Sequence, residues 1–167
     1  MKKYPHLEVR MSKIHHRGVF AARDIKKGER IIEYTGRRLT FAESDRSNSE
    51  YLFQLNKNTF IDGKNTARYI NHSCVPNCVI EIERGHIWID ALRTIRKGEE
   101  LVYNYSFDME EAKDYPCACG TRVCPGYIVD ETYWPKLRKK LKKAEKVPGT
   151  PTKSAVRVPG TFSTACV

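Results

Sequence analysis

Hydrophobic and polar side chains alternate along short stretches of this chain, and turn residues interrupt the alternation. The clearest case is residues 78–83 followed by 86–92, with Arg84-Gly85 between them. Successive side chains of a strand point to opposite faces, so this pattern is typical of a strand on each side of a tight turn. The sequence therefore predicts a β-hairpin here.

Further short strands are expected in the rest of the chain. Turns that contain glycine, such as Lys26-Lys27-Gly28-Glu29 and Arg96-Lys97-Gly98-Glu99, separate them. The strand that begins at Arg30 is expected to stop at Gly36, and residues 41–50 fit either a short helix or an irregular insert. Many short strands at close spacing predict a mainly β fold with little helix. The predicted strands are residues 7–9, 19–22, 30–35, 51–55, 59–62 and 100–107. Residues 51–55 and 59–62 are expected to form a second hairpin across Asn56-Lys57-Asn58.

The chain changes character after its last predicted strand. Cysteine, glycine and proline become frequent, and a basic segment follows them. The sequence therefore predicts three parts, which are a β domain over residues 1–108, a cysteine-rich segment over 109–130 and a basic helical and disordered tail over 131–167.

Most of the positive charge lies in the third part. The 167 residues carry a formal charge of +10, and residues 133–167 hold nine Lys or Arg and one Glu, which amounts to +8. Residues 133–146 predict a helix with one apolar face, and the sequence from Val147 on predicts disorder. A basic segment of this kind favours nucleic acid, acidic proteins or anionic membranes as partners, unless it is only a solvated tail.

The sequence predicts neither a secretory leader nor a membrane span. No apolar run follows the basic start Met1-Lys2-Lys3, and none reaches the about 20 residues that a membrane helix needs. We expect an intracellular protein, in the nucleus or on the chromosome of a eukaryote, or in the cytoplasm or nucleoid of a bacterium. Because thiols stay reduced there, the six cysteines are better interpreted as metal ligands or free thiols than as disulfides.

Three cysteines lie within eight residues, at positions 117, 119 and 124. A structural zinc site takes four ligands in a tetrahedron, and an all-sulfur set makes a closed site. The three cysteines therefore need one more ligand, which Cys74 or Cys78 supplies if the C-terminal segment folds back. The alternative is three cysteines that are buried or free.

A second polar motif is the stretch from Arg68 to Cys78, which contains Asn71-His72-Ser73-Cys74. These residue types favour a tight, non-repetitive turn that presents main-chain groups to a ligand. The alternative is a surface loop with incidental polar residues. Gly18 adds a position at which a side chain would block the close approach of another group, although an ordinary turn also explains a single glycine.

Tyr103 and Tyr105 lie two residues apart at the end of the last predicted strand. Strand geometry points them the same way. Two phenols beside an apolar strand can line a channel and hydrogen-bond an amine, and Tyr51 is a third candidate for the same pocket. The alternative is a pair of half-buried strand tyrosines.

Together these motifs resemble the SET-domain protein lysine methyltransferases with a post-SET zinc segment. The resemblance covers residues 7–128 in the family's order and spacing. Two features depart from the family pattern: a pre-SET zinc cluster is absent, and Arg37 stands where the second motif usually has an acid. The matching motifs are His16–Phe20, Glu33–Gly36, Arg68–Asn77, Gly98–Tyr105 and the cysteines at 117, 119 and 124.

The resemblance implies a SET-domain fold of small sheets around a threaded C-terminal segment. S-adenosyl-L-methionine binds on one face and a peptide lysine on the other, and a narrow channel joins them. The implied cofactor residues are His15, His16, Arg17, Gly18, Tyr51, Arg68, Asn71 and His72. The implied catalytic and channel tyrosines are Tyr51, Tyr103 and Tyr105. The implied Zn²⁺ ligands are Cys74, Cys117, Cys119 and Cys124, which leaves Cys78 and Cys166 without a role.

The implied activity is methyl transfer to a lysine of a histone or histone-like protein. Methyl transfer is an in-line displacement, so positioning supplies much of the acceleration. The residue two before the catalytic tyrosine limits product size in this family, so Tyr103 favours a mono- or dimethyl product. The alternatives are a non-histone substrate and an inactive relative that holds chromatin or nucleic acid through its zinc segment and basic tail.

Overall fold

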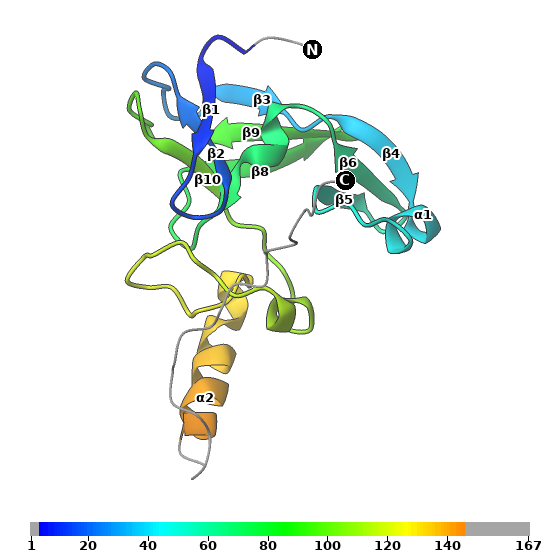
Figure 1. Ribbon diagram of the computed structural model, residues 1–167, viewed down its shortest axis with the longest axis vertical. Helices are drawn as coiled ribbons and strands as arrows, with labels where there is room; N and C mark the ends of the chain where they lie inside the picture. The colour runs from blue at the N-terminus through cyan, green and yellow to red at the C-terminus, as the bar shows by residue number, and fades with distance from the viewer. Residues whose placement is uncertain (1–3, 146–167) are drawn as a thin grey trace, which may run out of the picture.

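The computed structural model describes residues 4–145, and within them ten short strands form three small sheets (Figure 1). Helices are few and short apart from the last one. The predicted mainly β fold is therefore confirmed. The predictions of a disordered tail, of the last residue of the C-terminal helix and of no role for Cys166 concern positions outside the described residues.

The first sheet has four strands in the order β1-β2-β10-β7. β1 and β2 form an antiparallel hairpin, and β10 pairs with β2. β10 also pairs in parallel with the two-residue strand β7, which places Val102 beside Asn71 and Tyr103 beside His72. The bounds are β1 Leu7–Met11, β2 Arg17–Ala21, β7 Asn71–His72 and β10 Glu100–Tyr103.

Each of the other two sheets has three antiparallel strands and contains one of the predicted hairpins. Their orders are β3-β9-β8 and β4-β6-β5. Arg84 and Gly85 connect β8 to β9 with φ angles of 49° and 79°, which a tight two-residue hairpin turn requires. The bounds are β3 Arg30–Glu33, β8 Cys78–Glu83, β9 His86–Ala91, β4 Gly36–Thr40, β5 Leu52–Asn56 and β6 Thr59–Gly63.

Two predicted strand boundaries are wrong. Gly36 does not end a strand but begins β4, where a Cβ would lie 1.8 Å from the carbonyl oxygen of Asp62 on β6. The sequence of Gly36–Thr40 has no strand-like pattern. These residues form a strand because they pair with β6. The last strand ends at Tyr103 and not at residue 107, because beyond Tyr103 no strand pairs with it.

Helices occur at the edges of the sheets and after them. The polar insert begins with the short helix α1, Phe41–Asp45, which Thr40 and Glu43 stabilise through a reciprocal capping box. The C-terminal helix α2, Trp134–Glu145, starts one residue later than expected, after a turn of 3₁₀-helix. None of the described helices is long and apolar enough to span a membrane. The 3₁₀-helices are η1 Thr66–Tyr69, η2 Glu111–Asp114 and η3 Glu131–Tyr133.

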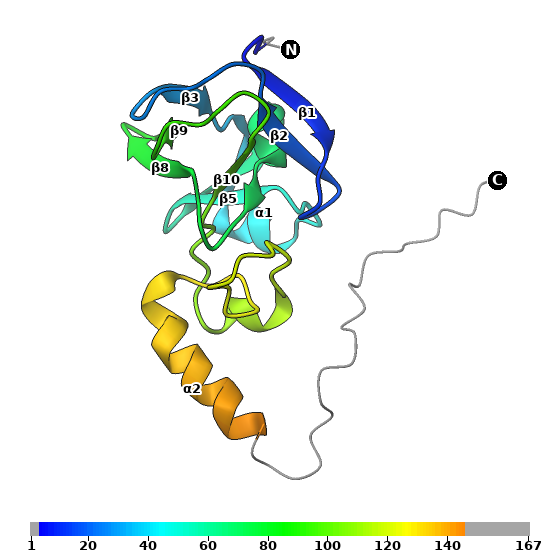
Figure 2. The same cartoon turned by 90° about the vertical axis from the view of Figure 1, so that its left-hand side faces the viewer.

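Apolar side chains form two separate clusters. The large one lies among the three sheets and includes Val19, Ile89 and Leu101, all fully buried. The small one contains Ala112, Val129 and Leu137, and it joins α2 to the cysteine-rich segment. Figure 2 shows α2 extending away from the sheets on the far side of this segment. We call residues 4–107 the body and residues 108–145 the lobe.

Candidate active site and metal centre

The polar stretch after η1 is buried inside the protein and is not a surface loop. Asn71, His72, Ser73 and Cys74 are each less than 9% exposed. The backbone N–H of Ser73 donates to the carbonyl oxygen of Tyr103 at 3.1 Å. The stretch is therefore fixed against β10, the strand that leads to the two predicted channel tyrosines.

Asn77 completes this attachment with both its main chain and its side chain. Its N–H donates to the carbonyl oxygen of Val102 at 3.1 Å, and its Oδ1 accepts the N–H of Val102 at 2.9 Å. Its Nδ2 donates to the carbonyl oxygen of Glu100 at 2.8 Å. A buried amide with all these bonds satisfied holds two segments in one register.

Asn71 connects this stretch to the segment before β2. Its Nδ2 lies 2.9 Å from the carbonyl oxygen of Arg17, 2.8 Å from Oε1 of Glu100 and 3.4 Å from the carbonyl oxygen of His15. Four of the predicted cofactor residues, His15 to Gly18, therefore lie next to a fifth. The side chains of His15, His16 and Arg17 remain exposed on the surface.

The backbone at Gly18 has no room for a side chain, as predicted. A Cβ there would lie 2.2 Å from Oε1 of Glu100. The group that approaches Gly18 in the structure is therefore a carboxylate of the protein itself.

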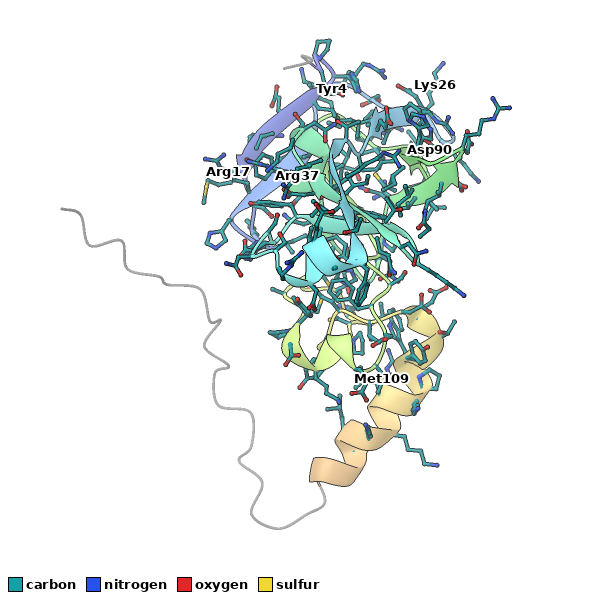
Figure 3. All side chains as sticks on the ribbon, turned by 90° about the vertical axis from the view of Figure 1, so that its right-hand side faces the viewer. Tyr4, Arg17, Lys26, Arg37, Asp90 and Met109 are labelled. Carbon is teal, nitrogen blue, oxygen red and sulfur yellow. The ribbon has the colours of Figure 1, made fainter. Side chains whose placement is uncertain are left out.

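Two arginine and two tyrosine side chains lie close together beside this segment. The guanidinium of Arg68 lies 4.7 Å from the ring centroid of Tyr51 and 4.6 Å from that of Tyr69. The guanidinium of Arg17 lies 5.6 Å from the centroid of the Tyr69 ring. These cation–π distances are within the favourable range, so Tyr69, which the sequence did not single out, joins three predicted site residues. Figure 3 shows Arg17 on the body, where it is the first residue of β2.

The two histidines before β2 also pack together. The rings of His15 and His16 have centroids 4.3 Å apart in an edge-to-face arrangement, and His16 adopts a left-handed φ of 32°. Two causes lower the pKa of His15. Desolvation has the larger effect, and the charge of the nearby His16 adds to it. The neutral form of His15 is therefore favoured at this surface.

Tyr103 and Tyr105 lie side by side with ring centroids 4.8 Å apart, although Tyr105 follows the end of β10. The Tyr105 hydroxyl donates to the carbonyl oxygen of Ile70 at 2.9 Å, and its backbone N–H donates to Nδ1 of His72 at 3.2 Å. Burial raises the pKa of both phenols, and nearby Tyr51 adds to the effect on Tyr105. Both tyrosines are therefore protonated at neutral pH.

Two further aromatic residues, Tyr34 and Phe53, contact the predicted tyrosines Tyr51 and Tyr103. The Tyr34 hydroxyl donates to the carbonyl oxygen of Tyr51 at 2.7 Å. The Phe53 ring stacks on Tyr103 at 6.2 Å between centroids and packs on Tyr34 at 5.3 Å. Sequence reasoning assigned neither residue to the site. The signal for Tyr34 was its place in the Glu33–Gly36 motif, whereas Phe53 looked like any apolar strand residue.

Four cysteines converge between the body and the lobe. The sulfur atoms of Cys74, Cys117, Cys119 and Cys124 all lie within 4.8 Å of one another, and those of Cys74 and Cys117 are 3.8 Å apart. Tetrahedral Zn²⁺ with sulfur at about 2.3 Å would hold its ligands about 3.8 Å apart, so this all-sulfur set fits a structural zinc ion.

Cys78 does not belong to this cluster, although it was the other candidate for a fourth ligand. Its thiol donates to Oδ1 of Asn77 at 3.4 Å, and burial raises its pKa to about 12. A buried thiol of this kind is inert and contributes to packing.

The cysteine cluster already favours one thiolate. A hydrogen bond between the thiols of Cys74 and Cys117 lowers the pKa of Cys117 and raises that of Cys74. Burial raises the pKa of Cys124, and the backbone N–H of Gly126, which donates to its sulfur at 3.3 Å, acts in the opposite direction. Donors of this kind stabilise sulfur that carries negative charge, which is the form that binds a metal.

His72 joins the tyrosines to the cysteines. Its Nδ1 accepts the N–H of Tyr105, while its Nε2 lies 3.5 Å from the sulfur of Cys74. A single buried ring therefore contacts both the predicted catalytic residue and a predicted metal ligand. A movement of Cys74 would therefore move the His72 ring against the backbone of Tyr105, and a movement of Tyr105 would act on Cys74 in the same way.

A groove of about 790 Å³ on another side of the body contains none of the predicted site residues. Its charged side chains are paired within the protein: Arg30 with Asp90, and Glu33 with His86. Convergence of the predicted residues around β10, and not this groove, therefore defines the candidate site.

The fold and the site define a class of protein, namely a domain of small sheets in which a buried Asn-His turn, a group of tyrosines and a four-cysteine centre meet. Residues 16–106 match the family model described as SET domain, which is more than half of the chain. The chain belongs to the SET-domain family.

Relatives with similar sequences have long chains. Histone-lysine N-methyltransferase trithorax of Drosophila virilis is 40% identical over 132 residues, covering 70% of this chain and 3% of that protein. Histone-lysine N-methyltransferase 2B of Homo sapiens is 40% identical over 133 residues, covering 70% and 5%. Histone-lysine N-methyltransferase, H3 lysine-4 specific, of Schizosaccharomyces pombe is 41% identical over 133 residues, covering 70% and 14%. The chain thus corresponds to a small part of each of them.

Proposed function

We propose that this protein transfers a methyl group from S-adenosyl-L-methionine to the side-chain amine of a lysine in a protein substrate. The observation that carries the proposal is the convergence around β10 of Tyr105, the Asn71-His72 turn and the segment before β2. When bound, the cofactor supplies an electrophilic methyl group on a sulfonium. Membership of the SET-domain family supports the same reaction.

The reaction needs a neutral lysine, whose ordinary pKa is about 10.4. A channel lined by Tyr51, Tyr103 and Tyr105 removes water from the amine, and burial disfavours its charged form. A cationic sulfonium close by acts in the same direction. Burial raises the pKa values of Tyr103 and Tyr105, so these two phenols stay neutral and place no negative charge, which would favour a protonated lysine, in this channel.

Tyr105 has a specific role in orienting the amine. A hydroxyl has one proton to donate, and Tyr105 gives it to the carbonyl oxygen of Ile70. Its oxygen therefore remains an acceptor for an amine N–H. An amine that donates one N–H to this fixed oxygen has its lone pair directed elsewhere, and positioning of this kind supplies much of the rate.

We assign the cofactor to the segment His15–Gly18, in which the first three residues are exposed. Arg68, Tyr51 and the main chain of Asn71 and His72 complete the assignment. The Asn71 side chain is already used by Arg17 and Glu100, which leaves main-chain groups of this turn for a ligand. The lowered pKa of His15 supports the assignment, because a neutral imidazole does not repel a cationic sulfonium.

We also propose that Cys74, Cys117, Cys119 and Cys124 hold one structural Zn²⁺. The support is the all-sulfur donor set and its spacing. Four thiolates leave no open position, so the ion has no place in the chemistry itself. Its role is to fasten the lobe to the buried turn through Cys74.

We propose that Tyr103 favours a mono- or dimethyl product. Its ring lies beside Tyr105 and is almost fully buried. A hydroxyl at this position can hold a water where an additional methyl group would otherwise sit, and displacing a well-held water costs free energy. The alternative is that Tyr103 only packs against Phe53.

Histones are the substrate class that the names of the relatives support. All three are named histone-lysine N-methyltransferases, and the Schizosaccharomyces pombe protein is named as specific for H3 lysine 4. We therefore propose a histone lysine as the substrate, in the nucleus or on the chromosome of a eukaryote. A non-histone protein remains the second candidate, because no residue of the site discriminates between the two.

Exposed basic side chains on helix α2 support a contact with nucleic acid. Positions 134–142 hold no acidic residue, and the basic side chains at 136, 138, 139, 140 and 142 are all exposed. Trp134 and Leu137 fix the opposite face to the lobe, and Arg138 donates to the carbonyl oxygen of Val123 at 2.8 Å. Cations held on one rigid face suit a phosphate backbone, so we propose that α2 contacts nucleosomal DNA.

The activity is tested by incubating the purified chain with labelled cofactor, separate histones and a cell lysate, and mapping the modified residue by mass spectrometry. We expect label on a histone lysine, and an H3 peptide with lysine 4 replaced by arginine tests the position. Label only on a lysate protein would favour the non-histone substrate. Cofactor binding without any transfer would favour the inactive relative.

A further inference from the structure

The carboxylate of Glu100, at the first residue of β10, is surrounded by donors from two distant segments. The Ser12 hydroxyl lies 2.8 Å from its Oε1 and 2.9 Å from its Oε2, and Nδ2 of Asn71 donates to Oε1 at 2.8 Å. Ser12 is 88 residues away in the sequence. Hydrogen bonds to a charged acceptor are about twice as strong as neutral ones.

Gly18 provides the space that this carboxylate occupies. A Cβ at Gly18 would lie 2.2 Å from Oε1 and 2.8 Å from Cδ of Glu100. Gly18 does not have the positive φ that makes glycine necessary elsewhere in the chain. A side chain at this position would therefore have to displace the Glu100 carboxylate from Ser12 and Asn71, and its Cβ would also lie 3.0 Å from Cβ of Ser12.

Backbone pairing does not hold the segment between β1 and β2 against β10. β10 pairs with β2 at Phe20 and Val19 only. Within the segment, Ser12 accepts the N–H of Ile14 at 2.9 Å and donates its own N–H to the carbonyl oxygen of His16 at 3.0 Å. The segment is thus closed on itself around Ser12, and the Glu100 side chain attaches Ser12 to the strand that leads to Tyr105.

We propose that Glu100 is a positioning residue for segment 12–18, and that Gly18 is glycine because the Glu100 carboxylate lies against it. The inference rests on the proposed function only in taking segment 12–18 as part of the cofactor site. The carboxylate sets the distance between this segment and β10, and thereby the distance between the cofactor residues and the channel tyrosines.

The adjacent residue Glu99 provides a matched control. Its carboxylate lies on the outside of the body, where it accepts from Arg93 at 2.8 Å and from the backbone N–H of Arg96 at 2.8 Å. Glu99→Gln removes the same charge one residue away without touching segment 12–18. A difference between the two variants therefore reports the place of the carboxylate and not the change in net charge.

We expect Glu100→Gln to weaken binding of S-adenosyl-L-methionine to the full-length chain by about tenfold or more, because the amide replaces an acceptor by a donor facing Ser12 or Asn71. Amide hydrogen exchange without cofactor should become faster in residues 12–18 and stay unchanged in the β8–β9 hairpin. Glu99→Gln should change neither measurement. Slower folding or lower stability alone would not produce this local pattern.

The test is a double-mutant cycle on cofactor affinity with Gly18→Ala, Glu100→Ala and both together, with exchange in residues 12–18 measured on the same proteins. If the carboxylate requires the glycine, Gly18→Ala has a large effect in the wild-type background and less than about twofold in Glu100→Ala. An equal loss in both backgrounds, or wild-type exchange in Glu100→Gln, would overturn the proposal. If wild-type protein binds no cofactor, the proposed function fails while the exchange measurements still decide the role of Glu100.

Discussion

The body and the lobe bury very different amounts of apolar surface. The main cluster of the body contains eighteen buried residues, whereas the lobe has three, Ala112, Val129 and Leu137. A small chain segment with so few buried side chains rarely folds on hydrophobic burial alone and needs a metal or a similar link. The four cysteines supply such a link, and one of them, Cys74, belongs to the body.

This difference indicates that the residues proposed for the chemistry belong to the body, whereas the lobe only stabilises their surroundings. The proposed reaction uses tyrosines of the body, which a large core holds in place. The lobe reaches this site through Cys117, whose sulfur lies 3.8 Å from that of Cys74 next to His72. It also contacts Phe107, through the Tyr115 ring at 4.9 Å between centroids and through the N–H of Asp130, which donates to the Phe107 carbonyl oxygen at 2.9 Å. The lobe should therefore be removable without unfolding the body, at a cost to the site.

The largest expected effect is that of losing the metal, which should affect the lobe and leave the body folded. We expect Cys117→Ser to abolish zinc binding and hydrogen-exchange protection in the lobe, and to weaken cofactor and peptide binding, while the β8–β9 hairpin stays protected. Cys74→Ser should act in the same way. Elemental analysis and hydrogen exchange measure both effects.

Cys78→Ala is the matched control, because Cys78 is buried outside the cluster. It should keep one zinc per chain. Zinc that is retained after Cys74→Ser would contradict the proposed ligand set. Unfolding of the body together with the lobe would contradict the proposed independence of the body.

The second effect belongs to the body alone. Tyr105→Phe removes the acceptor proposed for the amine and leaves the zinc centre and the cofactor residues in place. We expect turnover to fall by about a hundredfold or more, the size seen when one positioned polar group at a reacting centre is removed. Cofactor affinity and zinc content should stay close to wild type, whereas near-wild-type turnover would refute the role.

Tyr115→Phe in the lobe is the control for this variant. It changes another phenol of the chain at an exposed position. Steady-state kinetics on the same peptide should show little change. If Tyr115→Phe lowered turnover as much as Tyr105→Phe does, the assignment of the chemistry to the body would be wrong.

Local sequence patterns predicted the body better than they predicted its connections. The local pattern of strand-like runs on either side of a turn predicted both the β8–β9 and the β5–β6 hairpin, because each strand pairs with its neighbour in the chain. It missed β4, since Gly-Arg-Arg-Leu-Thr does not alternate and becomes a strand only against β6. It also extended β10 to residue 107, because apolar and aromatic residues continue after the pairing has ended.

The candidate site shows the same limit. The resemblance named Asn71, His72, Tyr105 and the four cysteines, and the structure brings these together. Nothing in the sequence linked Glu100 to Ser12, or Tyr34 to the backbone of Tyr51. Such contacts join residues that are far apart in the chain, and hydrophobic periodicity carries no information about them.

A smaller effect concerns the outer face of the lobe. Replacing Lys136, Lys139 and Lys142 by Glu should weaken binding to duplex DNA and reduce the slope of log affinity against log salt by about 3, with short-peptide turnover unchanged. Lys26, Lys27 and Lys57, exposed on the body, give the matched charge reversal of three lysines. Equal weakening by both sets would mean that net charge, and not α2, attracts DNA.

The smallest effect is on the product and not on the rate. Tyr103→Phe should keep activity and move the product toward more highly methylated lysine, because the channel loses a hydroxyl that holds water. Mass spectrometry of a peptide at full conversion measures the distribution. Trimethyllysine as the main wild-type product, or an unchanged distribution in the variant, would leave Tyr103 as a packing residue of the body.

Methyl transfer by the body is tested most directly by one experiment on zinc-loaded protein. Wild type and Tyr105→Phe are incubated with histones and S-adenosyl-L-methionine carrying a labelled methyl group, and the label is mapped by mass spectrometry. We predict label on the side-chain amine of a histone lysine with wild type, and a loss of about a hundredfold with the variant. Wild-type protein that binds the cofactor and zinc but transfers no label to any protein would contradict the proposed function.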